Sequence, residues 1–272
     1  MFIGVNLSTT KSDRMRDVDK VLLETFGFCY DQDPNRAVAV FLRYLSDLSP
    51  EHQQVWAARM LTGDHKLHPG YFDASILGER PKGVPIFNAF LHGQHHINEI
   101  AKLMGRAPFF REESIDDKPK GFGFLIRPTL QEFNDFVHTL DKLMSDNINV
   151  DYVAGEVERE FLETRGDGVV VAKPKGTISM LDEWIKKTYR AGDQQQIDDM
   201  LSAFRRVRRL RQAPAHAIRD DEFDQKYFKE QRELAMAAYD AVRAIRLMLS
   251  EHPAGADYSV PQWLADGTIW TQ

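Results

Sequence analysis

The chain has 272 residues, of which 43% are hydrophobic and 28% charged, and its formal net charge is -6 at pH 7. These values are typical of a globular protein with one large domain or two ordinary ones, and they exclude polyanion binding through overall charge. The single cysteine, Cys29, excludes internal disulfides and a cysteine-rich zinc site.

The sequence predicts neither secretion nor membrane insertion. The N-terminus lacks the basic region and sustained apolar core of a signal peptide. No apolar stretch approaches the roughly 20 residues of a membrane-spanning helix. We therefore expect a cytoplasmic protein without membrane contact.

Residues 1–125 are predicted to form a mostly helical N-terminal region. A short apolar stretch at residues 1–8 favours a strand, and Gly121–Ile126 favours another. Between them, spacing and capping signals predict helices, while Gly, Pro and mixed charge predict irregular connections. The expected helices are 12–28, 35–48, 49–63 and 86–104, and the expected connections are 62–86 and 105–121.

Residues 126–252 are predicted to form a helical domain with an inserted β-hairpin, followed by a tail at 253–272. Apolar residues recur at helical spacing over about 128–144, 178–190, 194–211 and 224–250. A β-branched run and the turn signal Arg165-Gly166-Asp167-Gly168 predict the hairpin at about 156–172. The tail carries Trp263 and Trp270, so we expect it to pack down. The predicted fold class is mainly α.

The arginine-rich end of the helix at 194–211 is the strongest candidate site. Five arginines occur between Arg205 and Arg211 of an acidic protein, and Pro214 and His216 follow. A guanidinium binds phosphate oxygens bidentately, and an imidazole exchanges protons near neutral pH. Because Pro214 interrupts helical geometry, a break between Arg211 and His216 could bring both side chains to one concave spot.

The Arg-to-His spacing by itself is not distinctive, since Arg59 with His65 and Arg246 with His252 show similar patterns. The context of Arg211 and His216 distinguishes them: an amphipathic helix, an arginine cluster, a proline, and then a long amphipathic helix. The alternative is structural, with the arginines on a solvated helix face and His216 capping or packing at a helix start.

The order of helix, Arg211-Gln212-Ala213-Pro214-Ala215-His216, short acidic loop and long helix resembles HEPN domains over roughly residues 178–252. The resemblance implies a dimerising helical bundle that cleaves RNA without metal or cofactor, often as a toxin or phage-defence effector. Arg211 and His216 would be catalytic. Gln212 departs from the Asn, Asp or His common in the family at that position. The RNA-binding residues would be Arg205, Arg208, Arg209 and Gln212.

The resemblance does not explain residues 1–125, which could hold a regulatory or antitoxin partner. Two other functions remain open. One is a binding module that holds RNA or a nucleotide without cleaving it. The other is a metal-dependent hydrolase, because one helix face presents metal-ligating side chains, with His65 or His68 as a further ligand. That face carries His92, His95, His96 and Glu99, which could equally be surface or hydrogen-bonded groups.

Overall fold

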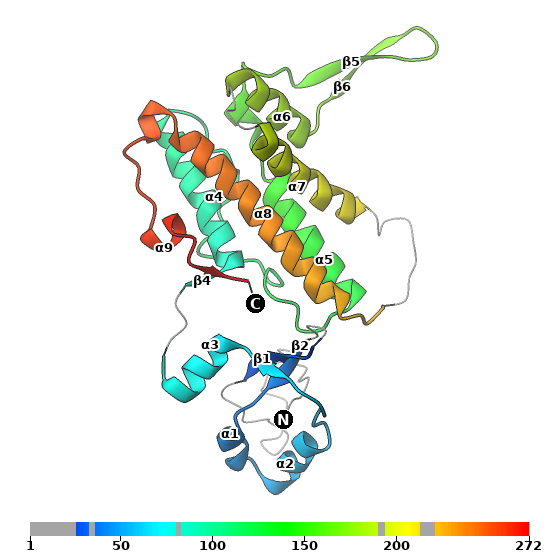
Figure 1. The fold of residues 1–272 in the computed structure, drawn as a ribbon. Coiled ribbons are helices and arrows are strands. Elements are labelled where there is room, and N and C mark those ends of the chain that lie inside the picture. The colour runs from blue at the N-terminus through cyan, green and yellow to red at the C-terminus, as the bar shows by residue number, and fades with distance from the viewer. Residues whose placement is uncertain (1–25, 33–35, 80–82, 190–193, 213–220, 272) are drawn as a thin grey trace. The chain divides into compact units, whose positions relative to one another are not determined.

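The computed structural model describes residues 26–32, 36–79, 83–189, 194–212 and 221–271 (Figure 1). The chain divides into two compact units, unit 1 at residues 1–82 and unit 2 at residues 83–272. Helix 86–104, which the sequence analysis assigns to the N-terminal region, therefore packs within unit 2. The strand expected at 1–8 and most of the helix expected at 12–28 lie outside the described residues.

Unit 1 contains a three-stranded antiparallel sheet in the order β2-β1-β3. A small apolar cluster, which includes the buried Leu45 and Trp56, lies among its short helices. The strands are β1 (Gly27–Tyr30), β2 (Arg36–Ala39) and β3 (Lys66–Leu67). The helices are α1 (Leu42–Ser46), α2 (Pro50–Ala57) and α3 (Pro69–Phe72), which continues into the π-helical turn η3 (Asp73–Leu77).

Two helix predictions in unit 1 are wrong. The end of the helix expected at 12–28 is strand β1, and the first half of the helix expected at 35–48 is strand β2. Both segments are short apolar runs, and periodicity cannot distinguish a helix from a strand over so few residues. Their pairing, which places Phe28 opposite Val38, determines that they are strands. The helix predicted after Ser49 is confirmed as α2, and the Ser49 hydroxyl accepts a hydrogen bond from His52 N at 3.4 Å.

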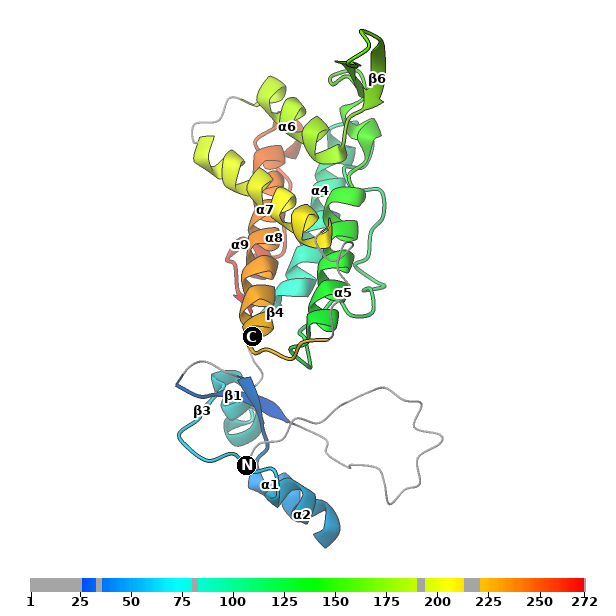
Figure 2. The ribbon, with the colours of Figure 1, turned by 90° about the vertical axis from the view of Figure 1, so that its right-hand side faces the viewer.

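Unit 2 is a helical bundle, and the mainly α fold class is confirmed. Helix α8 packs against α4, α5 and α7, and α7 also packs against α5 and α6 (Figure 2). The helices lie within a few residues of their predicted ranges. They are α4 (Ile86–Leu103), α5 (Leu130–Asp141), α6 (Thr177–Thr188), α7 (Gln194–Gln212) and α8 (Lys226–Ser250).

Irregular segments and short elements connect and cover these helices. Strands β5 (Glu160–Thr164) and β6 (Val170–Pro174) form an antiparallel hairpin, slightly later than the range of about 156–172 that we expected. Helix α5 continues into the π-helical turn η4 (Lys142–Asp146), and the 3-10 helix η5 (Val150–Val153) follows.

The C-terminal tail packs onto unit 2, as predicted. Strand β7 (Ile269–Trp270) pairs in parallel with β4 (Val84–Pro85), and the Trp270 ring stacks on Phe124 at 5.6 Å between centroids. The strand expected at 121–126 is wrong, since this segment is irregular and its phenylalanines pack on Phe87. The tail also contains the 3-10 helix η7 (Pro253–Gly255) and α9 (Gln262–Ala265).

No helix in the described part of the chain is long and apolar enough to cross a lipid bilayer. The longest, α8, carries charged residues along its length.

Gly93 allows α4 and α8 to approach each other closely. A Cβ at this position would lie 2.7 Å from Val242 Cγ1, well inside ordinary van der Waals contact. Helix α4 nevertheless runs unbroken through Gly93. The glycine therefore costs some helix propensity and permits the close packing of two buried helices.

We predict that Gly93→Ala lowers the free energy of unfolding by about 1 to 2 kcal/mol, because the clash with the stiff Val242 side chain outweighs the gain in helix propensity. Urea denaturation measures this. The double variant with Val242→Ala should lose less than the sum of the two single variants. A stabilising or neutral Gly93→Ala would contradict the close approach.

Candidate functional site

Two aspartates at the end of α5 face the arginines of α7. Asp141 is the last residue of α5, and Asp146 is the last residue of η4. Five residues along an α-helix turn a side chain by about 140°, which would separate the two carboxylates. The π-helical turn has i to i+5 hydrogen bonding, so it brings them back to one side. Both aspartates contact Arg208 and Arg211, which are three apart on α7 and share a face.

These four side chains form a compact ion cluster. Arg211 Nη1 donates to Asp141 Oδ2 at 2.6 Å and to Asp146 Oδ2 at 2.5 Å. Arg208 Nη2 donates to Asp146 Oδ1 at 2.7 Å. Arg208 Nε lies 3.2 Å from Asp141 Oδ1, an ion pair without hydrogen-bond geometry. The cluster therefore fixes α7 against the end of α5.

The electrostatics of the cluster favour the charged forms of Arg211 and Asp146. The hydrogen bonds to Asp141 and then Asp146 raise the pKa of Arg211 above its usual value. Burial opposes ionisation of Asp146, but the hydrogen bonds from Arg208 and Arg211 outweigh it and lower the pKa of Asp146. The Asp141 side chain is 0% exposed, and both arginines lie within ion-pair distance of it.

Arg211 keeps hydrogen-bonding capacity for a ligand. Within the described residues, Arg211 donates both of its side-chain hydrogen bonds from Nη1, so the donors on Nη2 and Nε are available. Its side chain is 28% exposed. The carboxylates thus orient the guanidinium through one nitrogen, and a phosphate could be bound by the other two.

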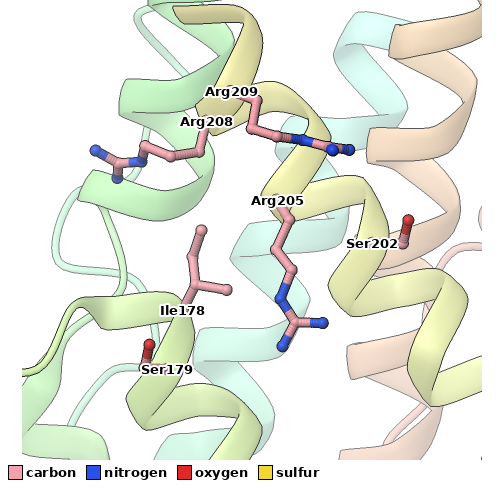
Figure 3. A pocket seen from close by; sticks show the side chains of 6 residues that line it. All are labelled: Ile178, Ser179, Ser202, Arg205, Arg208 and Arg209. Atoms are coloured by element: carbon pink, nitrogen blue, oxygen red, sulfur yellow. The ribbon is translucent and has the colours of Figure 1, made fainter. Parts of the chain in front are cut away.

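Three arginines of α7, Arg205, Arg208 and Arg209, line an open pocket of about 440 Å³ beside the N-terminal turn of α6 (Figure 3). Their guanidinium groups point in different directions in Figure 3, so they form a basic surface without a common focus. Arg205 donates to Asp182 at 2.7 Å, whereas Arg209 has no ion pair among the described residues. The lining residues are Ile178, Ser179, Ser202, Arg205, Arg208 and Arg209.

The other half of the expected catalytic pair is His216. His216 and the proline before it lie outside the described residues. Gln212, expected to bind RNA, is the last residue of α7 and is exposed. The structure therefore brings Arg211 together with Arg208 and two aspartates that the sequence analysis did not single out. Asp141 directly follows the apolar Leu140 and is fully buried. An acidic residue next to the apolar stripe of a helix is the sequence signal that could have identified this buried charge.

The histidines of α4 make contacts that compete with metal binding. His95 Nδ1 lies 2.8 Å from Glu113 Oε2, and His96 Nδ1 lies 2.6 Å from the Tyr258 hydroxyl. Burial and the neighbouring His95 lower the pKa of His96 to about 4, so it is neutral at pH 7. The His92 ring lies edge-on to Trp263, with 5.1 Å between centroids.

Metal-ligating side chains also do not gather in sufficient number in the part of the chain that the structure describes. Among the described residues, which include His92, His95, His96 and Glu99, no group of three or more His, Cys, Asp or Glu could hold a metal ion. The geometry thus gives the metal-dependent hydrolase no support. These histidines join α4 to residue 113 and to the C-terminal tail.

Comparison with known proteins adds no relative. No family model, curated protein or solved structure matches this chain.

We predict that Asp141→Asn lowers the free energy of unfolding by about 2 to 4 kcal/mol, because it removes a fully buried charge on which two arginines depend. Asp146→Asn is the matched control. Its side chain is 41% exposed, so we expect a loss below about 1 kcal/mol. Urea denaturation at pH 7 compares the two variants, and equal losses would contradict the assigned burial.

The pH dependence of the free energy of unfolding provides a further test of the ion pairs of Asp146. Its folded-state pKa is lowered, so its stabilising contribution is complete above the unfolded value near 4 and is lost as pH falls through the folded value. The difference between the wild type and Asp146→Asn should therefore shrink below about pH 4.

Proposed function

We propose that this chain is a metal-independent endoribonuclease of the HEPN type, with α5 to α8 as its helical bundle and the β5–β6 hairpin as an insertion. The observation that supports it best is the Arg211 guanidinium at the end of α7, which two carboxylates hold through Nη1 within the described residues. His216 follows five positions later in the chain, as the HEPN resemblance requires.

The proposed reaction uses the RNA 2′-hydroxyl as the nucleophile. The neutral imidazole of His216 accepts the proton of this hydroxyl, and the 2′-oxygen attacks the adjacent phosphorus. The bond from phosphorus to the 5′-oxygen breaks, and an imidazolium donates a proton to that leaving oxygen. Arg211 stabilises the negative charge that develops on the phosphate oxygens. DNA lacks the 2′-hydroxyl, so it would not be cleaved.

RNA would be held by Arg205, Arg208, Arg209 and Gln212, which lie along the C-terminal half of α7. Asp141 and Asp146 neutralise two positive charges of this surface, and Asp182 neutralises a third. Binding would therefore depend on a few oriented contacts more than on general attraction to phosphate.

In the cell, we propose a cytoplasmic toxin or phage-defence effector that acts as a homodimer, with Arg211 and His216 of two protomers in one composite cleft. Residues 1–125 would bind a regulatory or antitoxin partner. A second candidate is a module that binds RNA or a nucleotide without cleavage, for which the pocket lined by Arg205, Arg208 and Arg209 is the supporting observation.

We predict that the protein cleaves labelled RNA in excess EDTA and leaves DNA intact. Arg211→Ala and His216→Ala should each lower the cleavage rate at least a hundredfold, because each removes a group that acts in the transition state. Gel analysis of the products measures both effects.

Arg59→Ala and His65→Ala are matched controls, since this pair has a similar spacing but lies in unit 1. Both should cleave at the wild-type rate. RNA binding without cleavage by the wild type would favour the binding module. Cleavage abolished by EDTA would overturn the metal-independent mechanism.

We predict that heterodimers of Arg211→Ala and His216→Ala protomers have little activity, because the composite cleft needs both half-sites. Mixing the two variants and measuring RNA cleavage tests this. A fully active wild-type monomer at high dilution would contradict the composite cleft.

A further inference from the structure

The hairpin of β5 and β6 projects from the helical bundle near α6 (Figures 1 and 2). Every residue of β5 is exposed, as are four of the five residues of β6. An isolated two-stranded hairpin is at best marginally stable in water, and a third strand would stabilise it. Pairing with another strand would therefore stabilise the hairpin.

The pattern of hydrogen bonds between β5 and β6 determines which backbone N–H and C=O groups of each strand point away from the other strand. Arg165 N donates to Val169 O at 2.9 Å, and Lys175 N donates to Arg159 O at 2.8 Å. Hydrogen-bonded and non-hydrogen-bonded pairs alternate along an antiparallel ladder. Val170 and Ala172 therefore direct their N–H and C=O groups away from β5.

The outer edge of β6 is protected against pairing only at its C-terminal end. Exposed edges are commonly guarded by charged residues and proline. The four residues from Val169 to Ala172 include neither, and the protective residues Lys173 and Pro174 are the last two residues of β6. On β5, the outward-facing residues are Glu160, Leu162 and Thr164, and Glu163 places a second charge in the same five-residue strand, so charge is spread along β5. The accessible edge is that of β6.

The charge of the hairpin favours a second copy of the same chain as the partner. Residues 158–175 carry four acidic and four basic side chains, so this segment is neutral and neither repels its own copy nor attracts a nucleic acid. If two β6 strands pair antiparallel about Val171, Val170 lies opposite Ala172 of the other copy. In that register, Lys175 lies opposite Asp167 of the other copy.

We propose that the β6 edges of two copies pair about Val171 to form a four-stranded antiparallel sheet. Val170 and Ala172 of each copy exchange four backbone hydrogen bonds across the two-fold axis. Leu162 and Ala172 of one copy continue into Val170 and Thr164 of the other along one face, which joins two small apolar surfaces. This association does not depend on ribonuclease activity.

Val170→Pro tests the proposal because it removes an outward N–H and leaves the β5–β6 ladder intact. Thr164→Pro is the matched control, since Thr164 is the cross-strand partner of Val170 and faces outward on the opposite edge. Analytical ultracentrifugation of the full chain over a dilution series measures association. We expect Val170→Pro to weaken one association step at least tenfold and Thr164→Pro to leave it unchanged.

A wild-type chain that remains monomeric would overturn the proposal. So would an association that Val170→Pro leaves unchanged, or one that Thr164→Pro weakens equally. If association survives Val170→Pro, the dimer interface lies elsewhere, for example at the composite nuclease cleft. This outcome distinguishes failure of the β6 interface from failure of the proposed nuclease dimer.

A cysteine variant tests the register. In the proposed sheet, the two copies of residue 171 form a non-hydrogen-bonded pair with Cα atoms about 4.5 Å apart, within the range of a disulfide. Val171→Cys should form a covalent dimer on mild oxidation, whereas Leu162→Cys on β5 should not. The native Cys29 is buried and gives no background. Equal cross-linking of both variants, or of neither, would overturn this register.

Discussion

The buried carboxylate of Asp141 determines how the candidate site is assembled. A charge with no exposed surface must be compensated within the protein, and Arg208 and Arg211 provide that compensation. To reach it, α7 must cross the end of α5 with its arginine face turned inward. The π-helical turn then adds Asp146 to the same cluster. One buried charge thereby fixes the position at which α7 ends and the chain continues towards His216.

The ion pairs with Asp141 and Asp146 weaken the attraction of Arg208 and Arg211 for RNA but hold the two guanidinium groups in fixed orientations. A row of unpaired arginines would attract RNA over a long range, but each flexible side chain would lose conformational freedom on binding. Here Arg208 and Arg211 are already ordered by the aspartates, and Arg211 retains donors on Nη2 and Nε. Such a preorganised guanidinium contributes most where charge develops during a reaction. The same geometry makes the arginine count of the sequence a poor measure of available positive charge.

The helices of unit 2 could be predicted because each repeats an apolar stripe over several turns, as α8 does from Leu234 to Leu249. Strands β1 and β2 could not, since four-residue strands depend on pairing with distant residues. The π-helical turn has no sequence signature, so the alignment of Asp141 with Asp146 was equally inaccessible. Arg211 was identified from its neighbours along the chain, but the groups that hold it come from a helix about 70 residues away. The role of His216 stays a prediction.

The parallel pairing of β4 with β7 has a consequence for the topology of unit 2. Val84 lies beside Ile269, so the first and last strands of this unit are hydrogen-bonded neighbours. A short linker could join them into a closed loop with little distortion, and new ends could be opened at an exposed turn such as Gly166 to Gly168. Unit 2 is therefore suited to circular permutation, and equally to insertion as a whole into a loop of another protein.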